Sequence, residues 1–127
     1  AKHGARRVRA VDLDASTVAV VRENAERNGG GARITVAAGT LGEAWPWPRT
    51  SPVACAEVVV ANISSVAVRA MLPAIVAAVR PGGAAVLSGF LAVDAGVMVR
   101  AARRAGLRGV TRHDGLEWSC VVGRRAG

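Results

Sequence analysis

The sequence contains no tyrosine, one phenylalanine and three tryptophans among its 127 residues. Hydrophobic residues still make up 51% of the chain, so its core must be built mainly from Ala, Val, Leu and Ile side chains. A chain of this length can bury roughly two thirds of the surface that it exposes when unfolded. We therefore expect one close-packed α/β domain over residues 1–127, with no room for a second domain.

Cysteines and long apolar runs are also scarce. Cys55 and Cys120 lie far apart in the sequence and lack metal-ligand spacing, which disfavours a metal site and predicts two small thiols in a reducing compartment. The apolar runs are too short to cross a bilayer, and no charged start followed by an apolar middle marks a signal peptide. We expect a cytoplasmic protein with no membrane partner.

The positive charge is carried almost entirely by arginine. The formal net charge is +8, and sixteen of the seventeen basic residues are Arg. These arginines are scattered, and their pairs at 6–7, 103–104 and 124–125 form no basic block that would grip successive phosphates. Such a surface attracts acidic partners in general. A nucleic-acid partner stays an alternative on charge alone, but we expect no direct contact with nucleic acid.

The most informative stretch is residues 57–63, in which Val58-Val59-Val60-Ala61 leads directly to Asn62. A run that is apolar on both faces is typical of an interior strand in a parallel sheet. Ligands of open α/β sheets bind beyond the carboxyl ends of the strands, where Asn62 would offer one acceptor and two donors. Alternatively, Asn62 begins a turn or caps the next helix.

Predicted strands and helices alternate along most of the chain. Asp12 ends the first strand, and Asp14 is placed to cap the first helix with its carboxylate. Three strand–helix units in series predict a parallel sheet, and Asp114-Gly115 predicts the tight turn of a terminal hairpin. The predicted strands cover 7–13, 32–38, 57–62, 84–88, 109–113 and 117–123, and the predicted helices cover 15–28, 64–79 and 93–105.

Three local features add detail. Pro73 should kink or shorten the second helix, which Pro81-Gly82-Gly83 should end. Trp45-Pro46-Trp47-Pro48 must lie on a loop, as a cover over the hydrophobic edge of the sheet or as a stacking surface for a ring. The expected inward-facing positions are Val68, Leu72, Ile75 and Val79 in the second helix, and Val97, Ala101 and Ala105 in the third.

Six phrases occur in an order that resembles the bacterial ribosomal protein L11 methyltransferase family, which belongs to the Rossmann-like class I methyltransferases. They are VDLD (11–14), RENAERNG (22–29), VVVANI (58–63), PGG (81–83), LSGFL (87–91) and EWSCVVGRR (117–125). The resemblance implies a mostly parallel sheet with helices on both faces and a C-terminal antiparallel hairpin. It also implies S-adenosylmethionine as cofactor and methyl transfer to a lysine or α-amine of a ribosomal protein.

The resemblance assigns roles to four residues. Asp12 would accept hydrogen bonds from both ribose hydroxyls of the cofactor, although it could instead be a second helix-capping carboxylate. Leu13 would lie against adenine, if it is not an ordinary core residue, and Thr40 would reach the adenine edge. Asn62 would lie beside the methionine end of the cofactor and orient the attacking amine. No general base stands out, and His113 is expected to be a solvated surface histidine.

Departures from the family pattern are also informative. Asn62 is followed by Ile63-Ser64-Ser65 instead of the Pro-Pro-aromatic sequence of enzymes that methylate bases or glutamine amides, which disfavours DNA or a release factor as substrate. The first strand, the Gly-rich loop and the amino-terminal substrate domain of the family have no counterpart here. We therefore expect a truncated catalytic domain of reduced stability that binds the cofactor weakly or not at all. Without the absent strand, the strands ending at Asp12 and at Asn62 must either pair directly or leave buried backbone groups unpaired.

Two alternatives from other functional classes stay open. A noncatalytic α/β binding module could keep this fold without a cofactor site. A nicotinamide-dependent oxidoreductase could use Asp12 on an adenosine ribose. The oligomeric state has no signature in the sequence.

Overall fold

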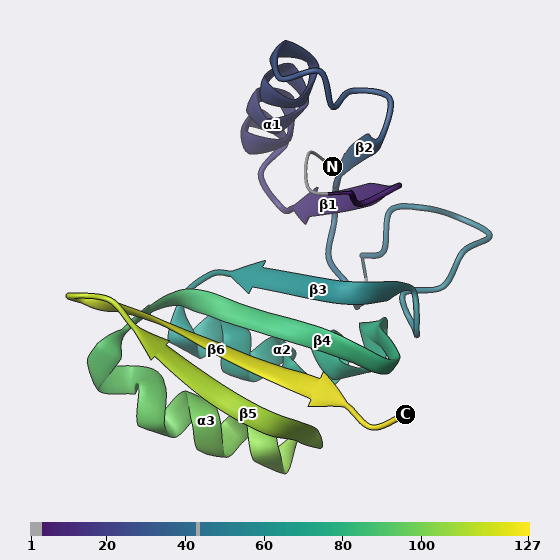
Figure 1. Cartoon of the computed structure of the whole chain (residues 1–127). Coiled ribbons are helices and arrows are strands. Elements are labelled where there is room, and N and C mark those ends of the chain that lie inside the picture. The colour runs from purple at the N-terminus through teal and green to yellow at the C-terminus, as the bar shows by residue number, and fades with distance from the viewer. Residues whose placement is uncertain (1–3, 43) are drawn as a thin grey trace. The chain divides into compact units, whose positions relative to one another are not determined.

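A computed structural model describes residues 4–42 and 44–127 of the chain. The chain divides into two compact units, one running to Thr50 and the other from Ser51 to Gly127 (Figure 1). The organisation as one domain over 1–127 stays a prediction. No helix within the described residues is long and apolar enough to span a membrane.

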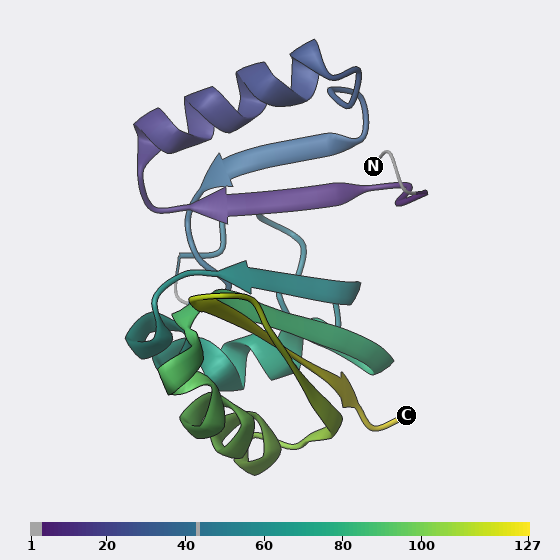
Figure 2. The ribbon, with the colours of Figure 1, turned by 60° about the vertical axis from the view of Figure 1, so that its left-hand side comes forward.

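The first unit is a strand–helix–strand unit made of β1 (Val8–Asp12), α1 (Ala15–Arg27) and β2 (Ile34–Ala38). The two strands are parallel and in register from Val8 opposite Ile34 to Asp12 opposite Ala38. Helix α1 crosses one face of this pair, as Figure 2 shows. Its cap is confirmed, because the carboxylate of Asp14 accepts hydrogen bonds from the backbone N–H and the hydroxyl of Ser16, at 2.9 and 2.6 Å.

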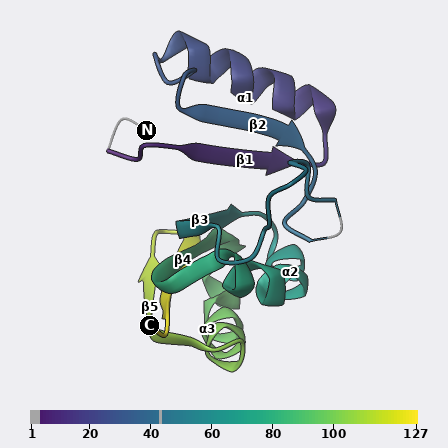
Figure 3. The same ribbon diagram turned by 90° about the vertical axis from the view of Figure 1, so that its right-hand side faces the viewer.

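The second unit is a four-stranded sheet in the order β3-β4-β6-β5. β3 and β4 are parallel, whereas β6 is antiparallel to both of its neighbours, which confirms the C-terminal hairpin. Helices α2 and α3 cover the same face of the sheet (Figure 3), and their shared core with the sheet includes Ile75, Leu87, Met98 and Val121. The elements are β3 (Ala56–Asn62), α2 (Ser65–Ala78), β4 (Val79–Leu91), the 3₁₀ turn η1 (Ala92–Asp94), α3 (Ala95–Arg104), β5 (Leu107–Asp114) and β6 (Trp118–Arg125).

The prediction that residues 57–62 form an interior strand is wrong for this chain. β3 is the edge strand of its sheet, and its only ladder within the described residues is with β4. Val58 and Val60 are 55% and 65% exposed, because α2 and α3 both cover the other face of this sheet. β1 and β3 lie in separate sheets, so of the two outcomes expected for these strands, direct pairing is not the one observed.

Two expectations about the second helix need correction, namely that Pro73 shortens it and that Pro81-Gly82-Gly83 ends it, whereas a kink at Pro73 stays a prediction. Pro73 lies inside α2 without ending it, because Leu72 and Ile75 on either side of it are almost fully buried and their packing outweighs one lost backbone hydrogen bond. The helix ends at Ala78, before Pro81-Gly82-Gly83, which lies inside β4. These residues bulge out of the ladder, since Ala56 pairs with Val79 but Val58 pairs with Ala84.

The inward-facing side of the third helix differs from the prediction. Ala95, Met98 and Ala102 are its buried residues, whereas Val97 is 37% exposed. The helix is apolar on two adjacent stripes, and the stripe that carries Met98 faces the sheet because it brings the largest side chain into the core. Of the stripe expected to be buried, Val97 is therefore exposed and Ala101 and Ala105 are half-buried.

The Trp45-Pro46-Trp47 loop packs within the first unit. The two indole rings meet edge to face with their centroids 5.0 Å apart, and the Arg9 guanidinium from β1 lies 5.3 Å from the Trp47 ring. The Trp45 Nε1–H donates to the Thr50 hydroxyl at 2.9 Å, which closes the loop. The loop is thus held against Arg9 of β1, and its role as a cover or as a stacking surface stays a prediction.

Candidate functional site

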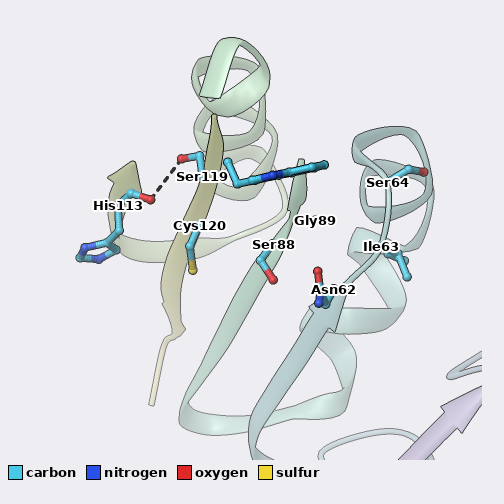
Figure 4. Close-up of a pocket in the computed structure, with 9 residues that line it drawn as sticks. Asn62, Ile63, Ser64, Ser88, Gly89, His113, Ser119 and Cys120 are labelled. Carbon is cyan, nitrogen blue, oxygen red and sulfur yellow. Dashed lines mark hydrogen bonds between the residues drawn. The ribbon is translucent and has the colours of Figure 1, made fainter. Parts of the chain in front are cut away.

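A cleft opens at the carboxyl end of β3 in the second unit. Asn62, the last residue of β3, lies opposite Ser88 of β4, so their side chains share one end and one face of the sheet (Figure 4). The cleft has a volume of about 630 Å³. It is lined by Asn62, Ile63 and Ser64 after β3, by Ser88 and Gly89 of β4, and by His113, Trp118, Ser119 and Cys120 of the hairpin.

The carboxamide of Asn62 is free to meet a ligand. Ser64 caps α2, since its hydroxyl accepts a hydrogen bond from the backbone N–H of Ala67 at 3.3 Å, so capping does not account for Asn62. Asn62 is exposed, and its carboxamide has no hydrogen-bond partner among residues 4–42 and 44–127. The alternative that Asn62 serves as the helix cap is therefore wrong.

Gly89 fixes the position of Asn62. The backbone of Gly89 has φ +90°, and a Cβ at this position would lie 2.6 Å from the carbonyl oxygen of Ile63 and 2.8 Å from Oδ1 of Asn62. The N–H of Ile63 donates to the carbonyl of Ser88 at 3.2 Å. β4 thus approaches the end of β3 as closely as backbone atoms allow. We did not single out Gly89 from the sequence, although a glycine inside the apolar phrase LSGFL is a signal of close backbone approach.

The acid–base side chains at or near the cleft point away from Asn62 or are used in other contacts. The imidazole of His113 contacts the hydroxyl of Thr111, with Nε2 and Oγ1 3.0 Å apart, and points away from Asn62 (Figure 4). Hydrogen bonds from the Arg112 guanidinium, and then from the Ser119 hydroxyl, hold the pKa of the Asp114 carboxyl below its usual range. Asp114 is therefore a poor proton acceptor, and no carboxylate lines the cleft within the described chain.

The remaining predicted site residues lie in the first unit, at the carboxyl ends of β1 and β2. The carbonyl of Asp12 accepts from the N–H of Gly39 at 3.0 Å, which brings Asp12 and Thr40 to the same end of the strand pair. Oδ1 of Asp12 accepts from the N–H of Asp14 at 2.8 Å, whereas Asp14 alone caps α1. The side chain of Leu13 is 75% exposed, so Leu13 is not a core residue.

Thr40 is committed to its own loop more than predicted. Its hydroxyl oxygen accepts hydrogen bonds from the backbone N–H groups of Gly42 and Ala44, both at 3.3 Å. Only its proton remains to be donated to a ligand. Among the residues predicted for the adenosine end, Asp12 and the exposed Leu13 are therefore less committed to contacts within the chain than Thr40 is.

Comparison with known proteins identifies the family. Residues 1–126 match the sequence profile described as ribosomal protein L11 methyltransferase (PrmA). Proteins named ribosomal protein L11 methyltransferase from Pelotomaculum thermopropionicum and Chloroflexus aurantiacus are 36% and 33% identical, each over 98% of this chain. The chain spans 38% and 43% of their respective lengths, or about two fifths.

Solved structures share the fold. A ribosomal protein L11 methylase from Lactobacillus delbrueckii subsp. bulgaricus superposes with a TM-score of 0.77 at 20% identity, over 99% of this chain and 61% of that one. The [4+2]-cyclase SpnF gives the same TM-score at 11% identity, over 99% of this chain and 68% of that one. The 127-residue chain has the Rossmann-like fold of methyltransferases. By its sequence, the chain belongs to the ribosomal protein L11 methyltransferase family.

Proposed function

We propose that this chain carries the methyl-transfer chemistry of an S-adenosylmethionine-dependent enzyme that modifies amino groups of ribosomal protein L11. Its curated relatives bear the name of that substrate. The observation that carries the proposal is the uncommitted carboxamide of Asn62 at the carboxyl end of β3, in an open cleft without carboxylates. A ribosomal substrate would make the cytoplasm the compartment of the reaction.

The first unit has groups that suit the adenosine part of the cofactor. An exposed carboxylate at Asp12 can accept hydrogen bonds from two ribose hydroxyls, because only one of its oxygens is partly engaged, by the N–H of Asp14. The exposed apolar side chain of Leu13 directly follows it and can cover one face of a purine. When bound, S-adenosylmethionine supplies a methyl group that is already activated for displacement.

The second unit would orient the attacking amine. Oδ1 of Asn62 can accept an N–H of the amine and so direct the nitrogen lone pair, without adding a positive charge to the site. Ser88 offers a second polar group beside it, and Trp118 gives the cleft a large apolar wall. The amine must be neutral to attack, and a cleft with no carboxylate does not stabilise its protonated form.

Nuclear magnetic resonance titration with S-adenosylhomocysteine tests the cofactor part, since it detects weak binding. We expect shifted amide signals at Asp12 and Leu13. The Asp12→Ala variant should weaken binding by about 1.5 to 3 kcal/mol, the scale of hydrogen bonds to a charged acceptor. Glu26→Ala, which removes an exposed carboxylate of α1, is the matched control and should leave the affinity unchanged. Equal affinities of the Asp12 variant and the unchanged chain would remove Asp12 from the site.

Transfer of a tritiated methyl group to ribosomal protein L11 tests the catalytic part. Asn62→Ala should lower turnover far more than it lowers cofactor affinity, because the carboxamide acts on the amine. A variant that loses affinity but keeps turnover at saturating cofactor would make Asn62 a cofactor ligand only. NAD is the comparison ligand, and its binding in preference to S-adenosylhomocysteine would support the oxidoreductase alternative. Binding of neither ligand would favour the noncatalytic module.

A further inference from the structure

Helices α2 and α3 carry the same sequence pattern, Val-x-Val-Arg-Ala, at 66–70 and 97–101. In α2 the spacing places Val66, Arg69, Ala70 and Pro73 on one side of the helix, whereas Val68, Leu72 and Ile75 enter the core. Val66, in the first turn of α2, is 75% exposed. Both helices therefore present apolar or small side chains and arginines to the outside.

These outward faces meet in a groove. It has a volume of about 620 Å³ and is lined by Val66, Arg69, Ala70, Leu72 and Pro73 of α2 and by Ala101, Arg104 and Ala105 of α3 and its cap. Small or apolar side chains make up most of this lining, and each helix contributes one arginine to it, Arg69 from α2 and Arg104 from α3. Alanines on the floor let another helix approach closely, because they put little bulk between two backbones.

The arginines beside the groove lack carboxylate partners. Neither α2 nor α3 contains an Asp or Glu. Within the part of the chain that the structure describes, Arg69, Arg100 and Arg104 take part in no ion pair, whereas Arg27 of α1 pairs with Glu23 at 2.7 Å. A groove with an apolar floor and unpaired cations at its rim is complementary to an apolar stripe flanked by carboxylates.

We propose that the groove between α2 and α3 docks an acidic amphipathic helix of a partner protein. Apolar residues of that helix at i, i+3, i+4 and i+7 would cover Val66, Ala70 and Ala101, and its carboxylates would pair with Arg69 and Arg104. Nucleic acid fits less well, since phosphates would leave the apolar floor wet and the groove has no aromatic side chain on which a base could stack. A second copy of this face would bring its own arginines and be repelled.

The test is binding of a synthetic 15-residue helical peptide with one leucine stripe flanked by glutamates, measured by fluorescence polarisation on the 127-residue chain. We expect micromolar affinity that falls with added salt. Joint Arg69→Glu and Arg104→Glu substitution should weaken binding roughly tenfold or more, because two attractions become repulsions. Ala101→Trp should abolish binding by filling the floor. The matched control is Arg108→Glu in β5, since the buried neighbour Leu107 faces the helices and Arg108 the opposite side of the sheet.

Four outcomes would overturn the proposal. The first two are no binding of the acidic peptide, and equal binding of a peptide with lysines in place of the glutamates. The other two are equal losses of peptide affinity in the groove and control variants, and displacement of the peptide by a 16-nucleotide RNA that the groove variants no longer bind. The last would assign the groove to nucleic acid. Far-UV circular dichroism of each variant checks that the helices are kept. Joint Arg69→Gln and Arg104→Gln substitution removes the two charges without reversing them, so its loss of peptide affinity should be smaller than that of the Glu variant and larger than that of the control variant.

Discussion

Gly89→Ala should be far more damaging than an ordinary glycine-to-alanine change, because two penalties act together. The residue has φ +90°, a backbone conformation that costs an alanine about 1 to 2 kcal/mol. Its new Cβ would also lie 2.6 Å from the Ile63 carbonyl oxygen and 2.8 Å from the Ile63 nitrogen, and backbone atoms cannot move aside as a flexible side chain can. Such overpacking adds about 1 to 3 kcal/mol, so the free energy of unfolding should fall by about 2 to 5 kcal/mol.

Gly82→Ala is the matched control. Gly82 lies in the same strand with φ +82°, but nothing lies within 4 Å of the Cβ that the substitution would add. It should therefore incur only the conformational penalty of about 1 to 2 kcal/mol. Urea unfolding followed by far-UV circular dichroism gives both values, and the amide signals of Asn62 and Ile63 should shift only in the Gly89 variant. Equal losses of stability in the two variants would refute the claim that close packing of β4 against Ile63 fixes the site.

Further changes test the core, the open face of β3 and the hairpin. Leu87→Ala should lower the free energy of unfolding by about 2 to 5 kcal/mol, because Leu87 is fully buried. Val60→Thr should lower it by less than about 0.5 kcal/mol, because Val60 is 65% exposed. Similar losses of stability for the two variants in urea unfolding would contradict the difference in burial between these positions. The pKa of Asp114 is lowered by hydrogen bonds from Arg112 and Ser119, so its stabilising contribution is present above its ordinary pKa and is lost as the pH falls through the lowered value. Asp114→Asn should therefore flatten the pH dependence of stability below about pH 4. A carboxyl titration midpoint of Asp114 at or above 3.8 would show that these hydrogen bonds do not favour the ionised form.

Features that depend on neighbouring residues could be predicted from the sequence. Asp14 caps α1, and Asp114-Gly115 marks the hairpin turn, because each signal acts over a few positions. Asn62 and Asp12 were expected at the carboxyl ends of strands, and both are there. What these two residues contact in a bound ligand stays a prediction.

Features that depend on tertiary packing could not be predicted in this way. The buried side of α3 depends on how the helix docks, since two of its stripes are apolar and only the docked structure selects that of Met98. The tolerance of Pro73 depends on the burial of Leu72 and Ile75. The role of Gly89 depends on the register of β3 against β4, which no single stretch of sequence encodes.

The open edge of β3 has a consequence for the colloidal behaviour of the chain. An edge strand presents unpaired N–H and C=O groups, and exposed valines such as Val58 and Val60 make that edge a template on which another polypeptide can add a strand. Natural edges are usually blunted by charge, and here Glu57, paired with Arg80, supplies it only near the beginning of β3. The net charge of +8 opposes self-association by long-range repulsion, and because salt screens this repulsion, we expect the solubility of the chain to fall as ionic strength rises.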